Sequence, residues 1–109
     1  MQSACLIYTC WPDPEQARAA ADRAVEDGLC ACANLLPGMT SVYRWQDRIE
    51  TAQECVVLFK TTTAGAPALR DLLASLHPYD EPAILALPVQ TQASSASFLD
   101  WIARTTGDA

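Results

Sequence analysis

The chain has 109 residues, half of them hydrophobic, and a formal net charge of −6 from 13 acidic and seven basic side chains. This length and composition fit one folded domain over residues 1–109 and exclude a disordered chain. The acidic balance argues against a nucleic-acid or anionic-lipid partner, and no apolar run approaches the roughly 18 residues of a membrane span.

The first predicted elements are a strand and a helix. Residues 4–11, ACLIYTCW, are apolar and rich in strand-forming side chains, which predicts a strand. A helix then begins with Asp13 as its cap and Pro14 in its first position, and Gly28 provides a left-handed stop. The predicted buried stripe of this helix consists of Ala17, Ala20, Ala21, Ala24 and Val25.

A long β-hairpin over residues 30–63 organises the rest of the predicted fold. Pro37-Gly38 interrupts its first arm, and the polar residues 46–48 separate the two arms. No Asn-Gly or Asp-Gly pair marks the turn, which leaves the turn type open. Each arm has about a dozen residues or more, against the usual five or six. We therefore expect the hairpin to overhang the domain.

The second half of the chain predicts another helix and a last strand. The helix opens at residues 65–67 and stops by about His77, because Pro78 follows. Its apolar stripe consists of Leu69, Leu72, Leu73 and Leu76. Residues 83–90 predict a strand, in which Pro88 indicates an edge position or a bulge.

A short terminal helix, capped by Ser94 or Ser95, completes the order β-α-β-β-α-β-α. This order is typical of the ferredoxin-like α+β arrangement, an antiparallel sheet with both main helices on one face. The strands are nevertheless apolar on both faces, as in the run Cys55–Phe59. A sheet that is apolar on both sides should be buried on both sides, so we expect self-association to cover the second face.

The five cysteines are an odd number and all lie in apolar, strand-like sequence: Cys5, Cys10, Cys30, Cys32 and Cys55. A secreted disulfide framework more often has an even count in loop-rich sequence. The N-terminal residues also lack the basic region of a secretory signal. We expect reduced thiols in a cytoplasmic protein, most of them acting as small buried hydrophobes.

Six short stretches occur in a recognisable order: residues 29–34 (LCACAN), 37–38 (PG), 41–45 (SVYRW), 49–50 (IE), 60–62 (KTT) and 77–82 (HPYDEP). With them, the chain resembles the CutA family of divalent-cation tolerance proteins from about Cys5 to Arg104. The resemblance implies a ferredoxin-like fold, a homotrimer whose long hairpins extend sheets between subunits, and a cytoplasmic location in bacteria. It also implies a role in tolerance of copper and other divalent metals, no established enzymatic reaction, and a likeness to the trimeric PII signalling proteins.

Cys32 and His77 are the candidate metal ligands, because the resemblance implies copper binding by a cysteine and a histidine at these motif positions. Thiolate suits Cu(I) and zinc, and imidazole suits Cu(II) and zinc. Thr9, however, stands where some relatives have a further cysteine, and one chain offers too few ligands for a closed tetrahedral site. The alternative is that the thiols fill the core and that His77 only ends a helix.

A second candidate site is a ligand cleft between subunits, formed by Tyr43, Trp45, Lys60, Tyr79 and Glu81. Aromatic side chains with one lysine and one carboxylate would recognise a small anionic or metal-chelated ligand. The alternative is interface packing, in which Tyr and Trp are common anchors. No nucleophile motif accompanies the carboxylate pair Asp80-Glu81, which favours a solvated loop over a catalytic site.

These observations favour a non-enzymatic homotrimer that binds copper, other divalent metal ions or a small ligand, with no further cofactor. The alternative within the same resemblance is a PII-like, small-ligand signalling trimer without a physiological metal. An enzyme lacks a catalytic dyad or triad here, and an RNA-binding module, which shares the βαββαβ order, lacks its aromatic pattern and has the wrong charge. We expect unusual heat resistance, because folding would be linked to association, and neither nucleic-acid partners nor membrane insertion.

Overall fold

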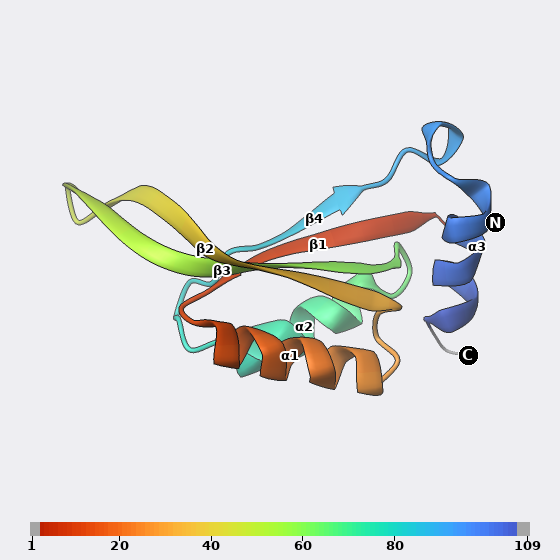
Figure 1. Cartoon of the computed structure of the whole chain (residues 1–109), viewed down its shortest axis with the longest axis horizontal. Helices are drawn as coiled ribbons and strands as arrows, with labels where there is room; N and C mark the ends of the chain where they lie inside the picture. Colours follow the sequence, from red (N-terminus) through yellow and green to blue (C-terminus); the bar gives the residue numbers. More distant parts are fainter. Residues whose placement is uncertain (1–2, 107–109) are drawn as a thin grey trace.

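The computed structural model describes residues 3–106, so residues 1–2 and 107–109 of the predicted domain lie outside it. The elements are β1 (Ala4–Trp11), α1 (Pro14–Glu26), β2 (Cys32–Trp45), β3 (Arg48–Thr62), α2 (Ala66–Leu76), β4 (Ile84–Pro88), the 3-10 turn η1 (Thr91–Ala93) and α3 (Ala96–Thr105). The strands form one antiparallel sheet in the order β2-β3-β1-β4. Helices α1 and α2 lie on the same face of this sheet, and α3 lies at the end opposite the hairpin (Figure 1). The element order and the antiparallel sheet agree with the ferredoxin-like prediction.

Helix α1 begins as the sequence predicts, but its buried stripe is narrower. The Asp13 carboxylate accepts a hydrogen bond from the Gln16 N–H at 2.8 Å, and Gly28 has a φ of +73°. The buried residues are Ala17, Ala20, Ala21 and Ala24. Val25 is 44% exposed, so its assignment to the stripe is wrong. The four alanines bring the helix close to the sheet, and Val25, about 100° further round than Ala24, lies at the margin of the contact.

The hairpin turn is shorter than the predicted polar interruption. Gln46 and Asp47 form it alone, with φ values of +51° and +64°, and Arg48 already belongs to β3, where it pairs with Trp45. A two-residue turn with positive φ at both positions is the type I′ geometry that matches the twist of the flanking strands. Neither residue is glycine, which is why the sequence did not signal the turn.

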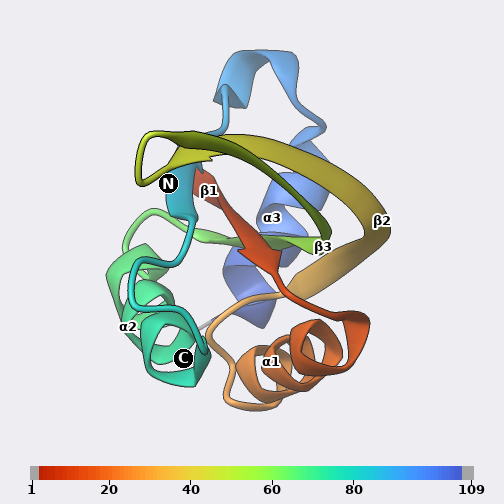
Figure 2. The ribbon, with the colours of Figure 1, turned by 90° about the vertical axis from the view of Figure 1, so that its left-hand side faces the viewer.

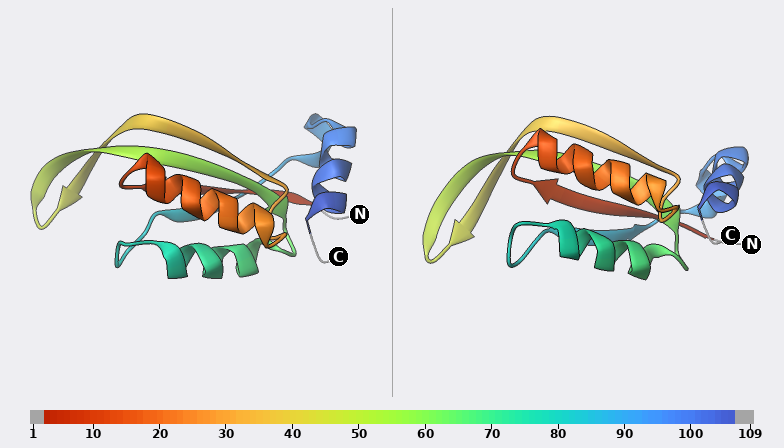
Figure 3. Two further views of the ribbon diagram at one scale, coloured as in Figure 1. Left: turned by 60° about the horizontal axis from the view of Figure 1, so that its bottom comes forward. Right: turned by 90° about the horizontal axis from the view of Figure 1, so that it is seen from below.

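A β-bulge at Pro37-Gly38 shifts the register of β2 against β3 by one residue. Leu36 pairs with Val56 and Met39 with Glu54, so β2 has one more residue than β3 between these pairs, and Gly38 has a φ of +78°. A shift of one residue exchanges the faces of a strand. The bulge therefore places Met39 on the same face as Leu36, and the hairpin curves beyond it (Figure 3).

The tip of the hairpin overhangs the sheet, as predicted. Strand β1 pairs with β3 only from Cys55 to Thr62, so residues 48–54 of β3 and 39–45 of β2 have no third strand beside them. Among the exposed side chains of this segment are Val42, Trp45 and Ile49. The chain measures 45 × 28 × 21 Å, and the hairpin accounts for its long axis (Figure 1).

The core lies between the sheet and the two main helices, which lie side by side beneath it (Figure 2). Its largest fully buried side chains include Ile7, Trp11, Val57, Phe59, Leu69 and Leu73. In α2, Leu72 is half-buried and Leu76 is 38% exposed, so the predicted four-leucine stripe is only half buried in this chain. Strand β4 is shorter than predicted, and Pro88 ends it at the edge of the sheet, as its missing N–H requires.

The opposite face of the sheet, which we call the open face, is apolar and largely uncovered. The strand register places on it Leu6, Tyr8 and Cys10 of β1, Leu36 of β2, Val56 and Leu58 of β3, and Leu85 and Leu87 of β4. Leu85 is 60% and Leu36 52% exposed. Helix α3 covers the end near Leu6, and Cys10 and Val56 are buried near the opposite end, whereas Leu36, Leu85 and Leu87 remain exposed among the described residues.

Candidate functional site

A cluster of polar side chains lies on the open face where the hairpin leaves the four-stranded sheet. We call it the tyrosine–carboxylate cluster; it consists of Tyr8, Cys10, Ser41, Glu54 and Tyr79. Glu54 is half-buried, and its Oε1 accepts a hydrogen bond from the Ser41 hydroxyl at 2.6 Å. Its Oε2 accepts one from the Tyr79 hydroxyl at 3.3 Å. The bulge places Ser41 beside this carboxylate, and the 77–82 loop brings Tyr79 to it.

The other acids of the cluster hold their protons more tightly than usual. Burial raises the pKa of the Cys10 thiol, and the charge of Glu54 raises it further. The pKa of Tyr8 is raised chiefly by its hydrogen bond with Cys10, whose sulfur lies 3.4 Å from the phenol oxygen. Burial, followed by the charge and hydrogen bond of Glu54, raises the pKa of Tyr79. The cluster therefore surrounds one carboxylate with protonated groups, and Tyr8, Cys10 or Tyr79 would have to lose a proton to bind a metal ion.

Replacing Glu54 by glutamine should make Tyr79 easier to ionise. The change removes the negative charge that opposes formation of the Tyr79 phenolate. We expect the Tyr79 transition to move to lower pH in an ultraviolet titration of tyrosinate. The matched control is Glu26→Gln on α1, far from the cluster, which should leave the titration unchanged. An unshifted Tyr79 transition in Glu54→Gln would contradict this coupling.

His77 is buried and both its ring nitrogens have partners. It caps the C-terminus of α2, where Pro78 prevents another turn. Its Nε2 lies 2.6 Å from the carbonyl oxygen of Cys10, and its Nδ1 accepts the Tyr79 N–H at 3.2 Å. These contacts assign the proton of a neutral ring to Nε2. The ring centroid lies 4.3 Å from that of Trp11 and 4.9 Å from that of Tyr79. Coordination of a metal would require His77 to give up one of these hydrogen bonds.

Cys32, the other predicted metal ligand, is the first residue of β2 and lies near the start of β1, away from His77. It is half-buried on the open face and pairs across the hairpin with Lys60, which pairs in turn with Leu6. His77 contacts β1 at Cys10. Cys10 is four residues after Leu6, which corresponds to about 13 Å along the strand at the usual rise per residue. One chain therefore does not bring Cys32 and His77 together. Within residues 3–106, no three His, Cys, Asp or Glu side chains form a group suited to a metal ion.

Cys30 is unsuited to assist Cys32. It lies in the hydrophobic core, and burial, with a smaller contribution from Cys32, raises the pKa of its thiol to about 12. A thiol that stays protonated is a poor metal ligand, because the thiolate is the coordinating form.

The residues of the second predicted site are likewise distributed along the chain. Tyr79 belongs to the tyrosine–carboxylate cluster, and Tyr43 is close enough to raise its pKa. Trp45 is exposed beside the hairpin turn, Glu81 is exposed in its loop, and Lys60 lies at the far end of the sheet. A single chain thus forms half of such a cleft at most.

Sequence reasoning missed Glu54, which holds the cluster together. The sequence contained an indication of it. Side chains alternate along a strand, so Glu54 lies on the same face as Val56, Leu58 and Lys60, which is the face expected to be buried. Such a carboxylate needs hydrogen-bond donors, which Ser41 and Tyr79 supply.

Lys60 is an ammonium without an acidic partner. Its Nζ donates a hydrogen bond to Asn34 Oδ1 at 2.5 Å and lies 5.6 Å from the centre of the Phe98 ring. Among the described residues, no carboxylate oxygen lies within 4.0 Å of this nitrogen; the ion pairs found there all involve arginine. The site around Lys60 therefore attracts negative charge.

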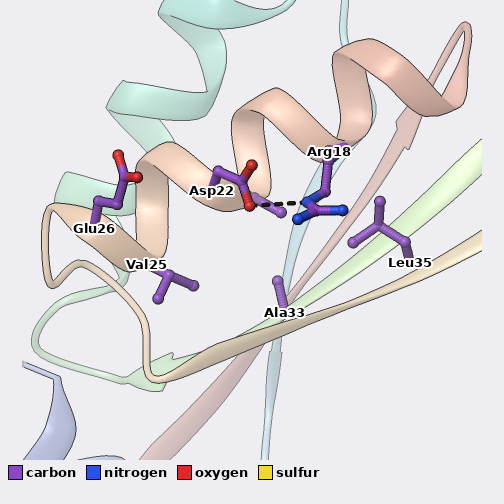
Figure 4. Close-up of a pocket in the computed structure, with 7 residues that line it drawn as sticks. Arg18, Asp22, Val25, Glu26, Ala33 and Leu35 are labelled. Carbon is purple, nitrogen blue, oxygen red and sulfur yellow. Dashed lines mark hydrogen bonds and ion pairs between the residues drawn. The ribbon is translucent and has the colours of Figure 1, made fainter.

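A shallow groove of about 240 Å³ runs between α1 and β2 on the helical side (Figure 4). Ala33 and Leu35 form its floor with Val25, and Arg18 pairs with Asp22 at its rim at 3.0 Å. Both charged side chains are exposed, as expected for a solvated helix face, and such a pair contributes little to stability. The groove gathers no set of side chains that suggests chemistry. In the described part of the chain, no helix is long and apolar enough to cross a membrane.

The comparison with known proteins agrees with the fold. The family model of the CutA1 divalent ion tolerance protein matches residues 5–105. The divalent-cation tolerance protein CutA of Thermus thermophilus is 44% identical over 107 residues, 98% of this chain and 100% of that relative. This chain spans only 54% of the longer human protein CutA.

Solved structures give the same result. The Cut A1 divalent cation tolerance protein from Thermus thermophilus superposes with a TM-score of 0.90 at 40% identity, over 95% of this chain and 99% of that one. The PII-like protein CutA from Nostoc sp. PCC 7120, in apo form, superposes with a TM-score of 0.88 at 29% identity, over 98% of each chain.

Proposed function

Because this chain belongs to the CutA1 family of divalent ion tolerance proteins, we propose that it is a non-enzymatic homotrimer that acts in the cytoplasmic response to divalent metal ions. The observation that carries the proposal is the open face, where Leu36, Leu85 and Leu87 are exposed beside an overhanging hairpin. A soluble protein rarely leaves so large an apolar surface in water. Three copies, each laying its hairpin over a neighbour, would cover the face and pair the free edges.

Association would also complete the sites that one chain leaves incomplete. Cys32 and His77 lie at opposite ends of β1, and the Tyr79 and Lys60 ends of the predicted cleft are equally separated. We place copper or another divalent metal ion between copies, with Cys32 from one chain and His77, or the Glu54 carboxylate, from the next. Thiolate, imidazole and carboxylate are together suited to copper and zinc.

Metal titration of the reduced protein tests this placement. We expect wild type to bind Cu(I) or Zn²⁺ with a fixed stoichiometry per chain, and Cys32→Ser and His77→Ala to bind at least about tenfold more weakly, because each removes a ligand. Cys55→Ala is the matched control, since the Cys55 thiol is buried in the core and faces α1 and α2. Equal affinity of all four proteins would contradict a site at Cys32 or His77.

A second candidate function, a PII-like small-ligand trimer without a physiological metal, is favoured by Lys60. Its ammonium lies across the hairpin from Cys32, where it repels a cation, and no described carboxylate neutralises it. A metal at Cys32 would therefore bind against a positive charge, whereas an anionic ligand would be attracted. The Nostoc protein with a similar fold is described as PII-like.

A further inference from the structure

Helix α3 and the end of the open face form a cavity of about 180 Å³ that is open to solvent. Its walls are mainly apolar and include Leu6 of β1, Val89 after β4, and Phe98 and Leu99 of α3. The Lys60 ammonium enters from β3 as the one charged lining group. Apolar walls with a single convergent charge are typical of sites for small amphiphilic molecules.

The hydroxyl groups of the cavity are already engaged. Ser94 donates to the carbonyl oxygen of Gln90 at 2.6 Å, and Ser95 accepts the Phe98 N–H at 3.3 Å as the cap of α3. A ligand would therefore meet one strong polar group, Lys60, and otherwise hydrocarbon.

The Lys60 ammonium has capacity for one more partner. It carries three N–H donors, of which one is used by Asn34, while the Phe98 ring lies near it at 5.6 Å. The residue is half-buried, and its hydrogen bond to Asn34 lies in an exposed position, so an anion can reach the ammonium from solvent. The chain carries a net charge of −6 and this is its only lysine, yet no described acidic side chain has been placed within reach of it.

We propose that this cavity binds a small organic anion, a carboxylate or phosphate monoester with a short apolar tail. The anionic group pairs with Lys60 Nζ, and the tail lies against Leu6, Val89 and Leu99. Pockets for drug-sized ligands measure about 300–1,000 Å³, so a cavity of about 180 Å³ admits a much smaller molecule. The inference rests on the small-ligand function proposed above and specifies the class of ligand and its place within one chain.

The test measures binding of hexanoate, hexyl phosphate, inorganic phosphate, hexanol and hexylamine to the reduced wild-type protein, by calorimetry and amide chemical shifts. We expect saturable binding of hexanoate or hexyl phosphate, with shifts at the residues that line the cavity. Hexanol and inorganic phosphate, which lack the charge or the tail, should bind at least about tenfold more weakly, and hexylamine should not bind. The relative affinity of hexanoate and hexyl phosphate identifies which anionic group the site prefers.

Lys60→Gln should weaken hexanoate binding at least tenfold, and Lys60→Arg, which keeps the charge, should restore most of it. Arg70→Gln makes the same charge change on the exposed side of α2, where Arg70 pairs with Asp71, and should bind as wild type does. Circular dichroism verifies that each variant folds. Equal hexanoate binding in Lys60→Gln, or binding of hexanol as tight as that of hexanoate, would overturn the proposal.

The same variants separate this site from the proposed metal function. Lys60→Gln should retain the oligomeric state of wild type and bind a metal at Cys32 at least as tightly, because it removes the positive charge across the hairpin from that thiol. If hexanoate binding is absent while a metal still binds at Cys32, the cavity proposal fails and the metal function stands. If hexanoate binds and no metal does, the small-ligand function is supported and the metal function fails.

Discussion

Replacing Leu85 by aspartate is expected to convert the proposed homotrimer into monomers at micromolar concentration. Leu85 is 60% exposed, is the second residue of β4 and faces the same side as Tyr8 of β1. In a trimer that covers the open face, the substitution buries an unpaired carboxylate in each of three copies. Such a burial costs several kcal/mol per charge, and charged side chains are depleted from interface cores for this reason.

The same change should remove the heat resistance expected of the assembly. Folding that is linked to association loses that contribution when the copies separate. For a domain of this size, each kcal/mol lost lowers the midpoint of thermal unfolding by roughly 4–8 °C. We therefore expect a decrease on the order of 10 °C or more, measured by calorimetry at a fixed protein concentration.

Leu76→Asp is the matched control for this experiment. Leu76 is also an exposed leucine, but it belongs to α2 on the other side of the sheet. This variant should elute and scatter light as the wild-type oligomer does. A wild-type protein that is monomeric at micromolar concentration would remove the basis of the prediction, and so would a trimeric Leu85→Asp variant.

Local patterns were sufficient to predict most of the fold. The bounds of β1 agree residue for residue, and the Asp13 cap and Gly28 stop of α1 are present. Helix α2 ends at Leu76, with His77 as its C-cap before Pro78. Each of these signals acts within a few residues of the chain, through propensity, capping or the missing N–H of proline. The hairpin turn was not predictable in the same way, because Gln46 and Asp47 adopt positive φ without the glycine that usually indicates it.

The candidate site depends on register, which local patterns do not determine. The pairs Met39–Glu54 and Cys10–Val56 follow from a one-residue bulge and from the order of the strands. These features bring Tyr8, Cys10 and Glu54 to one place, and the loop after α2 adds Tyr79. They also separate Cys32 from His77, although the motifs that contain them suggest a single site. Residue types in a motif thus indicate candidate side chains, and the topology determines which of them meet.

Replacing His77 by alanine is expected to destabilise the metal-free protein by about 2–4 kcal/mol, the usual range for a buried side chain that packs and hydrogen-bonds. The change leaves the Cys10 carbonyl oxygen and the Tyr79 N–H without their partner and opens a cavity between the Trp11 and Tyr79 rings. Chemical denaturation of the chelator-treated protein at fixed concentration measures the loss.

Two further variants test whether the loss of stability is specific to the hydrogen bonds of His77. His77→Gln retains an N–H donor at a similar distance from the backbone and should recover part of the stability. Cys32 is half-buried at the start of β2, so Cys32→Ser should lower the free energy of unfolding by less than about 1 kcal/mol. A His77→Ala protein as stable as wild type without metal would show that its ring contributes nothing to the fold.

Since both ring nitrogens already have partners, His77 can coordinate a metal only by exchanging one of those hydrogen bonds for a coordinate bond. Metal binding at His77 would then loosen either its contact with β1 or the start of the loop that carries Tyr79, and so alter the tyrosine–carboxylate cluster.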